Sequence, residues 1–176
     1  MAPPAPPASP GPTWHHRGVS NSESSLAGPA GSPYEWFQRA QELLASGNSD
    51  AAAQLLERLL EAEPGSRSVL EAYARAVFDA RRYGDAVSAF GALLEVAPDD
   101  DYAHFGIGMS LWRQQEFVLA RDHLSMAFVM RPDRTEYGKA LSQVKATLRA
   151  RAADQLPLNG PLSVPAIIDV YEVDES

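Results

Sequence analysis

Between residue 33 and about residue 153, apolar side chains recur every three or four positions, in runs that glycine and proline interrupt. This spacing puts the apolar side chains on one face of a helix, as in a helix that packs against a core. It predicts an all-α fold with seven helices in succession. Their expected bounds are 34–46, 49–62, 67–80, 83–96, 100–113, 117–130 and about 133–153.

The interruptions of this pattern are regular. Pro64, Pro98 and Pro132 lie 34 residues apart, and each follows an apolar helical stretch. Proline ends the helix before it, because it lacks the backbone donor and holds the preceding residue extended. Gly47 separates the first two helices. The expected N-caps of the third and fifth helices are Ser66 and Asp99. A fixed period of this length is typical of stacked supersecondary units.

With each proline at position 32 of a 34-residue unit, three copies align in phase. Small residues share two positions: Ala40, Ala74 and Gly108 at position 8, and Ala52, Ala86 and Ala120 at position 20. Bulky residues share others, such as Leu56, Phe90 and Leu124 at position 24. Small residues let two antiparallel helices approach closely, and the bulky ones fill the space between them.

This pattern resembles the tetratricopeptide repeat, which has a large residue at position 4, a small one at 8, an aromatic near 17, alanine at 20 and proline at 32. The aromatic residues that fit it are Trp36, Tyr83, Phe90 and Phe117. The resemblance covers residues 33 to about 153 and rests on three in-phase copies. It departs at Arg39, where leucine is usual, and at Leu70 and His104, which replace the aromatic residue of position 4.

The resemblance implies a right-handed solenoid of three antiparallel helix pairs, in repeats 33–66, 67–100 and 101–134, with a capping helix at 133–153. An open solenoid needs such a cap, with one face buried and the other in water. The apolar line of the cap is Tyr137, Leu141, Val144 and Leu148. The cationic residues expected around that line are Lys139, Lys145, Arg149 and Arg151.

In this family, positions 2, 5, 9, 12 and 13 of each repeat line a concave groove. The resemblance assigns to it Tyr34, Phe37, Gln41, Leu44 and Ala45 in repeat one. Repeat two contributes Ser68, Glu71, Arg75, Phe78 and Asp79, and repeat three Tyr102, Phe105, Met109, Trp112 and Arg113. Aromatic residues, methionine and arginine are concentrated at binding surfaces. Alternatively, the residues of position 12 belong partly to the core, and so do Phe37 and Phe105.

The resemblance implies a non-catalytic adaptor that binds a partner peptide or helix in the groove. Some relatives grip the carboxylate of a chaperone tail with lysine, asparagine and arginine. Here positions 5 and 9 of repeats one and three are Phe37, Gln41, Phe105 and Met109, so a mainly apolar ligand is expected instead. The alternative is a structural protein that self-associates through the solenoid surface.

Two segments flank the repeats. Residues 1–32 are rich in proline, alanine, glycine and serine, which predicts a disordered tail. Residues 154–176 join an apolar stretch to five acidic residues without a basic one, and so contribute most of the net charge of −8. We expect this C-terminal tail to dock on an apolar face, in the groove or against the cap helix, and to gate access for the partner. Alternatively, it is a motif read by a partner, or simply exposed.

Composition excludes several classes of function. Without cysteine the chain has no disulfide, thiolate zinc site or cysteine nucleophile, which fits a cytoplasmic protein. The negative charge argues against nucleic acid, and no apolar run is long enough for a membrane span. The N-terminus lacks the features of a secretory signal. Thirteen arginines against two lysines suggest a GC-rich, bacterial genome.

No cluster of residues in the sequence meets the requirements of a catalytic, metal-binding or phosphate-binding site. Asp99, Asp100 and Asp101 lack the spacing of a calcium loop, and they suit the start of a helix. His104 and His123 lie in the same repeat, but no nucleophile or orienting acid accompanies them. The glycines at 106 and 108 fall within a helix and not in a phosphate loop. The sequence therefore predicts no enzyme activity, no metal and no cofactor.

Overall fold

The computed structural model describes residues 31–162. Within that range every regular element is an α-helix, which confirms the predicted all-α class. The helices are α1 (Pro33–Ala45), α2 (Ser49–Ala62), α3 (Arg67–Asp79), α4 (Tyr83–Val96), α5 (Asp101–Arg113), α6 (Phe117–Met130) and α7 (Thr135–Ala153). The predictions for residues 1–30 and 163–176 lie outside the described residues.

Three helix starts differ from the expectation, and that of α1 is Pro33, one residue earlier than predicted. Asp100, not Asp99, is the N-cap of α5, because its carboxylate accepts a hydrogen bond of 2.9 Å from the backbone of Ala103. The same carboxylate accepts a bond of 2.7 Å from Arg67, so it also ties the start of α3 to the start of α5. The cap helix begins at Thr135, two residues later than predicted.

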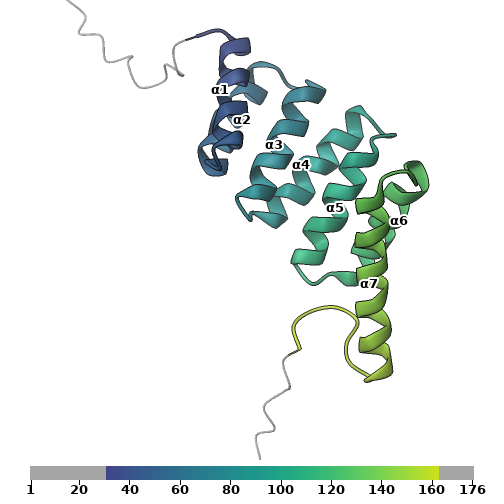
Figure 1. Cartoon of the computed structure of the whole chain (residues 1–176). Helices are drawn as coiled ribbons and strands as arrows, with labels where there is room; N and C mark the ends of the chain where they lie inside the picture. Colours follow the sequence, from purple (N-terminus) through teal and green to yellow (C-terminus); the bar gives the residue numbers. More distant parts are fainter. Residues whose placement is uncertain (1–30, 163–176) are drawn as a thin grey trace, which may run out of the picture. The chain divides into compact units, whose positions relative to one another are not determined.

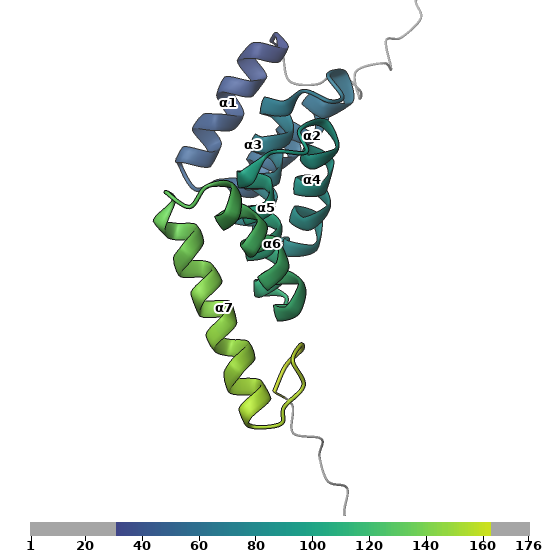
Figure 2. The same cartoon turned by 90° about the vertical axis from the view of Figure 1, so that its right-hand side faces the viewer.

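The helices form two rows. Each helix packs on the next one along the chain, and α1, α3, α5 and α7 also contact one another in series. In the described part of the chain, α2, α4 and α6 make no such contacts with one another. Because the first row is the tighter one, the stack curves toward it, and α1, α3, α5 and α7 form its inner layer. Figures 1 and 2 show the two rows, with α1 and α7 at the two ends.

Small residues set the distance between the rows. The alanines of positions 8 and 20, Ala40, Ala74, Ala52, Ala86 and Ala120, are all 0% exposed. The glycines of α5 allow a still closer approach of the neighbouring helix. A Cβ on Gly106 would lie 2.4 Å from the ring of Phe90, and one on Gly108 would lie 2.7 Å from Leu124 Cγ. These glycines are therefore packing residues, as the sequence indicates.

The turn inside each repeat has the same geometry three times. Gly47, Arg81 and Gln115 occupy equivalent positions, and all have positive φ angles, of 79°, 61° and 64°. In the second turn, the backbone of Arg82 donates to Val77 and that of Arg81 to Phe78, which is the Schellman pattern. The first and third turns repeat both bonds. Only the first repeat has glycine at the left-handed position.

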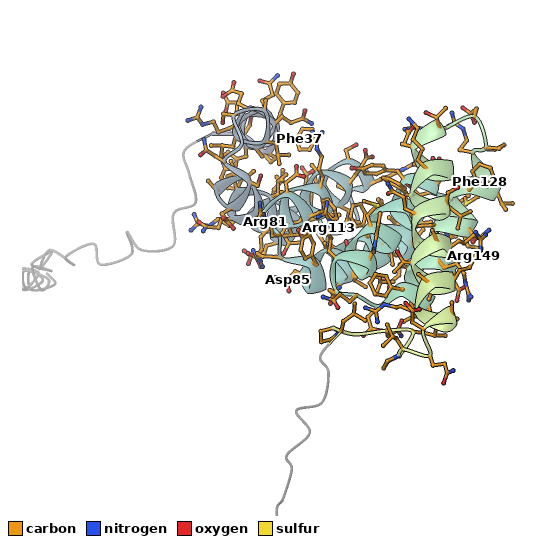
Figure 3. All side chains as sticks on the ribbon, turned by 60° about the horizontal axis from the view of Figure 1, so that its bottom comes forward. Phe37, Arg81, Asp85, Arg113, Phe128 and Arg149 are labelled. Atoms are coloured by element: carbon orange, nitrogen blue, oxygen red, sulfur yellow. The ribbon has the colours of Figure 1, made fainter. Side chains whose placement is uncertain are left out.

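The cap helix α7 is the first helix of a fourth repeat without its partner. Positions 4, 8 and 11, which face the second helix in the other repeats, are here Gly138, Ser142 and Lys145. They line an open hollow beside Phe128 of α6. Figure 3 shows Phe128 next to α7. The buried face of α7 contains the predicted Tyr137, Leu141 and Val144.

Arg151, one of the cations expected around the apolar line of the cap, is buried. Arg151 is 7% exposed, and its guanidinium lies over the ring of Phe117 at 4.6 Å. It donates hydrogen bonds of 2.7 Å to the carbonyls of Pro157 and Gly160. The chain after α7 folds back and surrounds the guanidinium, so this cation is satisfied by backbone carbonyls instead of water.

We expect Arg81→Gly to raise the free energy of unfolding by about 0.5 kcal/mol, because glycine relieves the left-handed strain and loses part of that gain as chain entropy. Arg81 is exposed, and its side chain makes no hydrogen bond or ion pair in the described structure. Gly47→Ala, the matched change in the first turn, should lower it by about 1 kcal/mol. Urea unfolding measures both, and a loss of stability in Arg81→Gly would contradict the interpretation.

Candidate functional site

The inner layer encloses a cavity of about 670 Å³. Side chains of three successive first-row helices line it, together with one residue from the turn before α7. The lining residues are Phe37, Gln41, Leu44, Ala45, Ser68, Glu71, Ala72, Arg75, Tyr102 and Arg134. In Figure 3, Phe37 lies on the side of α1 that faces the other helices. We call this cavity the groove.

The lining includes eight of the fifteen positions assigned to the concave surface. The aromatic, amide and charged side chains among these eight, which are the stronger candidates for binding, are Phe37, Gln41, Glu71, Arg75 and Tyr102. A sixth candidate, Tyr34, is 68% exposed and lines a neighbouring hollow of about 450 Å³ that shares Phe37 and Gln41. Most of the candidates from repeats one and two, together with Tyr102 of repeat three, therefore gather around a common space.

The remaining candidates lie elsewhere on the inner layer. Phe78 packs edge-on against Tyr83, with ring centroids 5.5 Å apart, and Phe105 stacks on Tyr137 of the cap helix at 4.6 Å. Met109 and Trp112 are half-buried against the core. Arg113 is exposed at the C-terminal end of α5 (Figure 3). Thus Phe105, Met109 and Trp112 of repeat three contribute largely to packing.

Arg134 is a groove residue that the repeat positions do not indicate. It is the last residue of repeat three, just before α7. Its guanidinium lies 5.6 Å from the ring centroid of Tyr137 and 3.3 Å from the carboxylate of Glu136. Because α7 takes the place of a fourth first-row helix, the residue before it reaches the end of the groove. The equivalent residue in repeat two is the N-cap Asp100.

The groove combines apolar surface with balanced charge. Arg75 pairs with Asp79 at 3.6 Å, and both side chains are largely exposed, so the pair leaves the guanidinium accessible. Glu71 is exposed beside it. Burial raises the pKa of Tyr102, so its phenol is neutral and can donate a hydrogen bond. Phe37 and Leu44 supply the apolar wall.

The pair His104 and His123 lies outside the groove, between α5 and α6. Their Nδ1 atoms are 3.2 Å apart, so one ring donates a hydrogen bond to the other when both are neutral. Burial lowers the pKa of both rings, and the charge of His104 lowers that of His123 further. Asp100 and Asp122 act in the opposite direction. Among residues 31–162, no group of three or more histidine, aspartate or glutamate side chains is placed to hold a metal ion.

The histidine pair makes stability depend on pH. Both pKa values are lower in the folded chain than the value of about 6.5 for a free histidine, so unfolding takes up protons below that value. The stabilising contribution is complete above about pH 6.5 and is lost as the pH falls through the lowered pKa values. Urea unfolding should therefore show a stability that declines from pH 7.5 to pH 5.5.

The matched variant replaces each histidine by the leucine at the equivalent position of another repeat, which is Leu70 for His104 and Leu55 for His123. His104→Leu combined with His123→Leu should flatten the decline over the same pH range. An equally steep decline in the double variant would assign the pH dependence to other groups.

Sequence models of the tetratricopeptide repeat match residues 43–104 and 74–135, which together make up more than half of the chain. The two matches overlap in the second repeat, as expected for consecutive units. Together with the two-row helical stack, they show that the chain belongs to the tetratricopeptide repeat family. No curated protein sequence matches the chain.

Solved structures share the fold at low sequence identity. MamA from Desulfovibrio magneticus RS-1 is 15% identical, with a TM-score of 0.65 and 70% of each chain covered. The first tetratricopeptide domain of Spaghetti (RPAP3), bound to the HSP90 peptide SRMEEVD, is 15% identical, with a TM-score of 0.63 over 66% of this chain and 93% of that one. An O-GlcNAc transferase from Thermobaculum terrenum is 19% identical, with a TM-score of 0.59 over 65% of this chain and 22% of that one.

Within residues 31–162, no helix is both long enough and apolar enough to cross a bilayer.

Proposed function

We propose that the chain is a non-catalytic adaptor that binds a peptide or helix of a partner protein in the groove. The observation that carries the proposal is the groove lining, in which α1, α3 and α5 present aromatic, amide and arginine side chains to one space. Aromatic residues and arginine are the side chains that most often dominate binding energy at protein interfaces. Tetratricopeptide repeats generally act as protein-interaction modules, and the RPAP3 neighbour is bound to a peptide.

The groove chemistry favours a ligand that is mainly apolar and has some charge. Phe37 and Leu44 can cover an apolar side chain, while Arg75 and Arg134 can pair with a carboxylate of the ligand. Glu71 can pair with a cation in the same way. The residues that grip a chaperone-tail carboxylate in some relatives have no counterpart at Phe37 and Gln41. We therefore do not extend the peptide specificity of the RPAP3 domain to this chain.

The second candidate function is self-association through the outer surface of the solenoid. It is favoured by exposed apolar side chains on the outer row, of which Val129 is 78% exposed. The two functions separate in one experiment, because groove substitutions affect capture of a partner and outer-row substitutions affect the size of the particle.

The groove is tested with the double variant Phe37→Ala and Arg75→Ala. Affinity purification from the native host with the unmodified chain and the variant in parallel identifies partners that require the groove. For such a partner, calorimetry should show a loss in affinity of about tenfold or more, as expected for two side chains at the centre of an interface. Light scattering should show an unchanged particle size.

The matched control is Arg58→Ala, an exposed arginine of the outer helix α2. It should leave both affinity and size unchanged. Thermal unfolding of all three proteins must coincide, since Phe37 is half-buried. Unchanged affinity in the groove variant would rule out the groove as the binding site, and altered particle size with unchanged capture would favour self-association.

A further inference from the structure

The outer face of α6 differs in character from the outer faces of α2 and α4. Leu119, Met126 and Val129 are 51%, 52% and 78% exposed. We call these three residues the α6 stripe. The equivalent residues are Asp85, Ala92 and Glu95 in α4, and Ala51, Arg58 and Glu61 in α2. Since the three repeats have the same fold, packing within the solenoid does not require apolar residues at these positions. An exposed apolar stripe of this kind indicates a surface that another segment or molecule covers.

A shallow hollow adjoins the stripe. It has a volume of about 640 Å³, and Met126, Val129 and Met130 line it together with the His104–His123 pair. Asp122 and Ser125 complete its lining. An extended apolar segment can bury its side chains in the hollow, whereas a flat helix face would leave them more exposed.

The chain after α7 is fastened at the N-terminal end of the same helix. Asn159 Oδ1 accepts a hydrogen bond of 3.1 Å from the backbone of Val118, and the backbone of Gly160 donates one of 2.9 Å to Gln115. Arg151 holds the carbonyls of Pro157 and Gly160, as described above. Leu162, two residues after this anchor, is 61% exposed. The anchor is therefore next to Leu119, where the stripe begins.

The length and residue order of segment 163–176 fit the stripe. The α6 helix has 14 residues and is about 21 Å long. About six extended residues cover that distance. Val164, Ile167 and Ile168 precede every acidic residue of the segment. Asp169, Glu172, Asp174 and Glu175 follow, with Val170, Tyr171 and Val173 between them. A segment that runs from the anchor along α6 thus brings its isoleucines to the hollow.

The charge at the C-terminal end of α6 favours the same direction of the segment along the helix. Arg131 follows the C-terminal end of α6 and is exposed. It pairs with Asp133 at the surface. An exposed pair of this kind exchanges partners at little cost, so Arg131 can also attract the acidic end of the segment.

We propose that residues 163–176 of the chain bind along the α6 stripe, with Ile167 and Ile168 in the hollow and the acidic end near Arg131. The segment then covers the outer face of the last repeat and leaves the groove open. This inference does not depend on the proposed adaptor function, because the stripe and the groove lie on opposite rows of helices.

The test uses the fact that the chain has no cysteine. Val129→Cys places a single thiol in the stripe, and Glu61→Cys places one at the equivalent, polar position of α2. Each is made in the full chain and in a chain that ends at residue 162, which retains the anchor. The rate of reaction with a thiol reagent is then measured at several protein concentrations.

The Val129→Cys thiol should react about tenfold more slowly in the full chain than in the shortened one, as expected when the bound state is populated about ten to one. The Glu61→Cys thiol should react at equal rates in the two. Ile167→Asp combined with Ile168→Asp should restore fast reaction at Val129→Cys without changing the length of the chain.

Equal rates at Val129→Cys with and without the segment would overturn the proposal. Protection that increases with protein concentration would overturn it as well, because a second copy would then be the cover. Protection that survives the two aspartate substitutions would show that the isoleucines are not in the hollow. All three outcomes leave the groove experiment unaffected, so the two proposals fail separately.

Discussion

The structure depends on how closely neighbouring helices can approach. The two rows are held at a short distance because positions 8 and 20 have no side chain larger than a methyl group, and in α5 the limit is a single hydrogen at Gly106 and Gly108. That spacing lets Phe90 and Leu124 fill the space between the rows. The tighter contact within the inner row then curves the stack and produces the groove. Groove and core thus follow from the same packing constraint.

The sequence predicts the helices well because the signals that end them are local. Prolines at a 34-residue spacing mark the helix ends, and α2, α4 and α6 have the bounds that the periodicity predicts. The starts of α5 and α7 differ from the prediction. In α5, neighbouring aspartates compete for the N-cap, and Asp100, which caps the helix, also pairs with Arg67. A repeat pattern contains no information about that long-range contact.

The candidate site is predictable to a smaller extent. Repeat positions indicate that Phe37, Gln41, Glu71, Arg75 and Tyr102 face the groove, because each lies at a fixed angle around its helix. They do not indicate that Tyr137 stacks on Phe105, nor that Arg134 closes the end of the groove. Both depend on where the cap helix docks. The burial of Arg151 is the same kind of case, since its partners are backbone carbonyls of a segment without periodicity.

The polar residues on the free side of α7 set the length of the array. In every complete repeat, positions 4, 8 and 11 are covered by a second helix, whereas Gly138, Ser142 and Lys145 meet solvent. A lysine at position 11 needs water around its ammonium group, and a glycine at position 4 leaves a following helix little to pack on. These three side chains end the array, because they offer no apolar face to a further helix. A duplicated repeat inserted before residue 135 would therefore lengthen the protein without exposing a new apolar end.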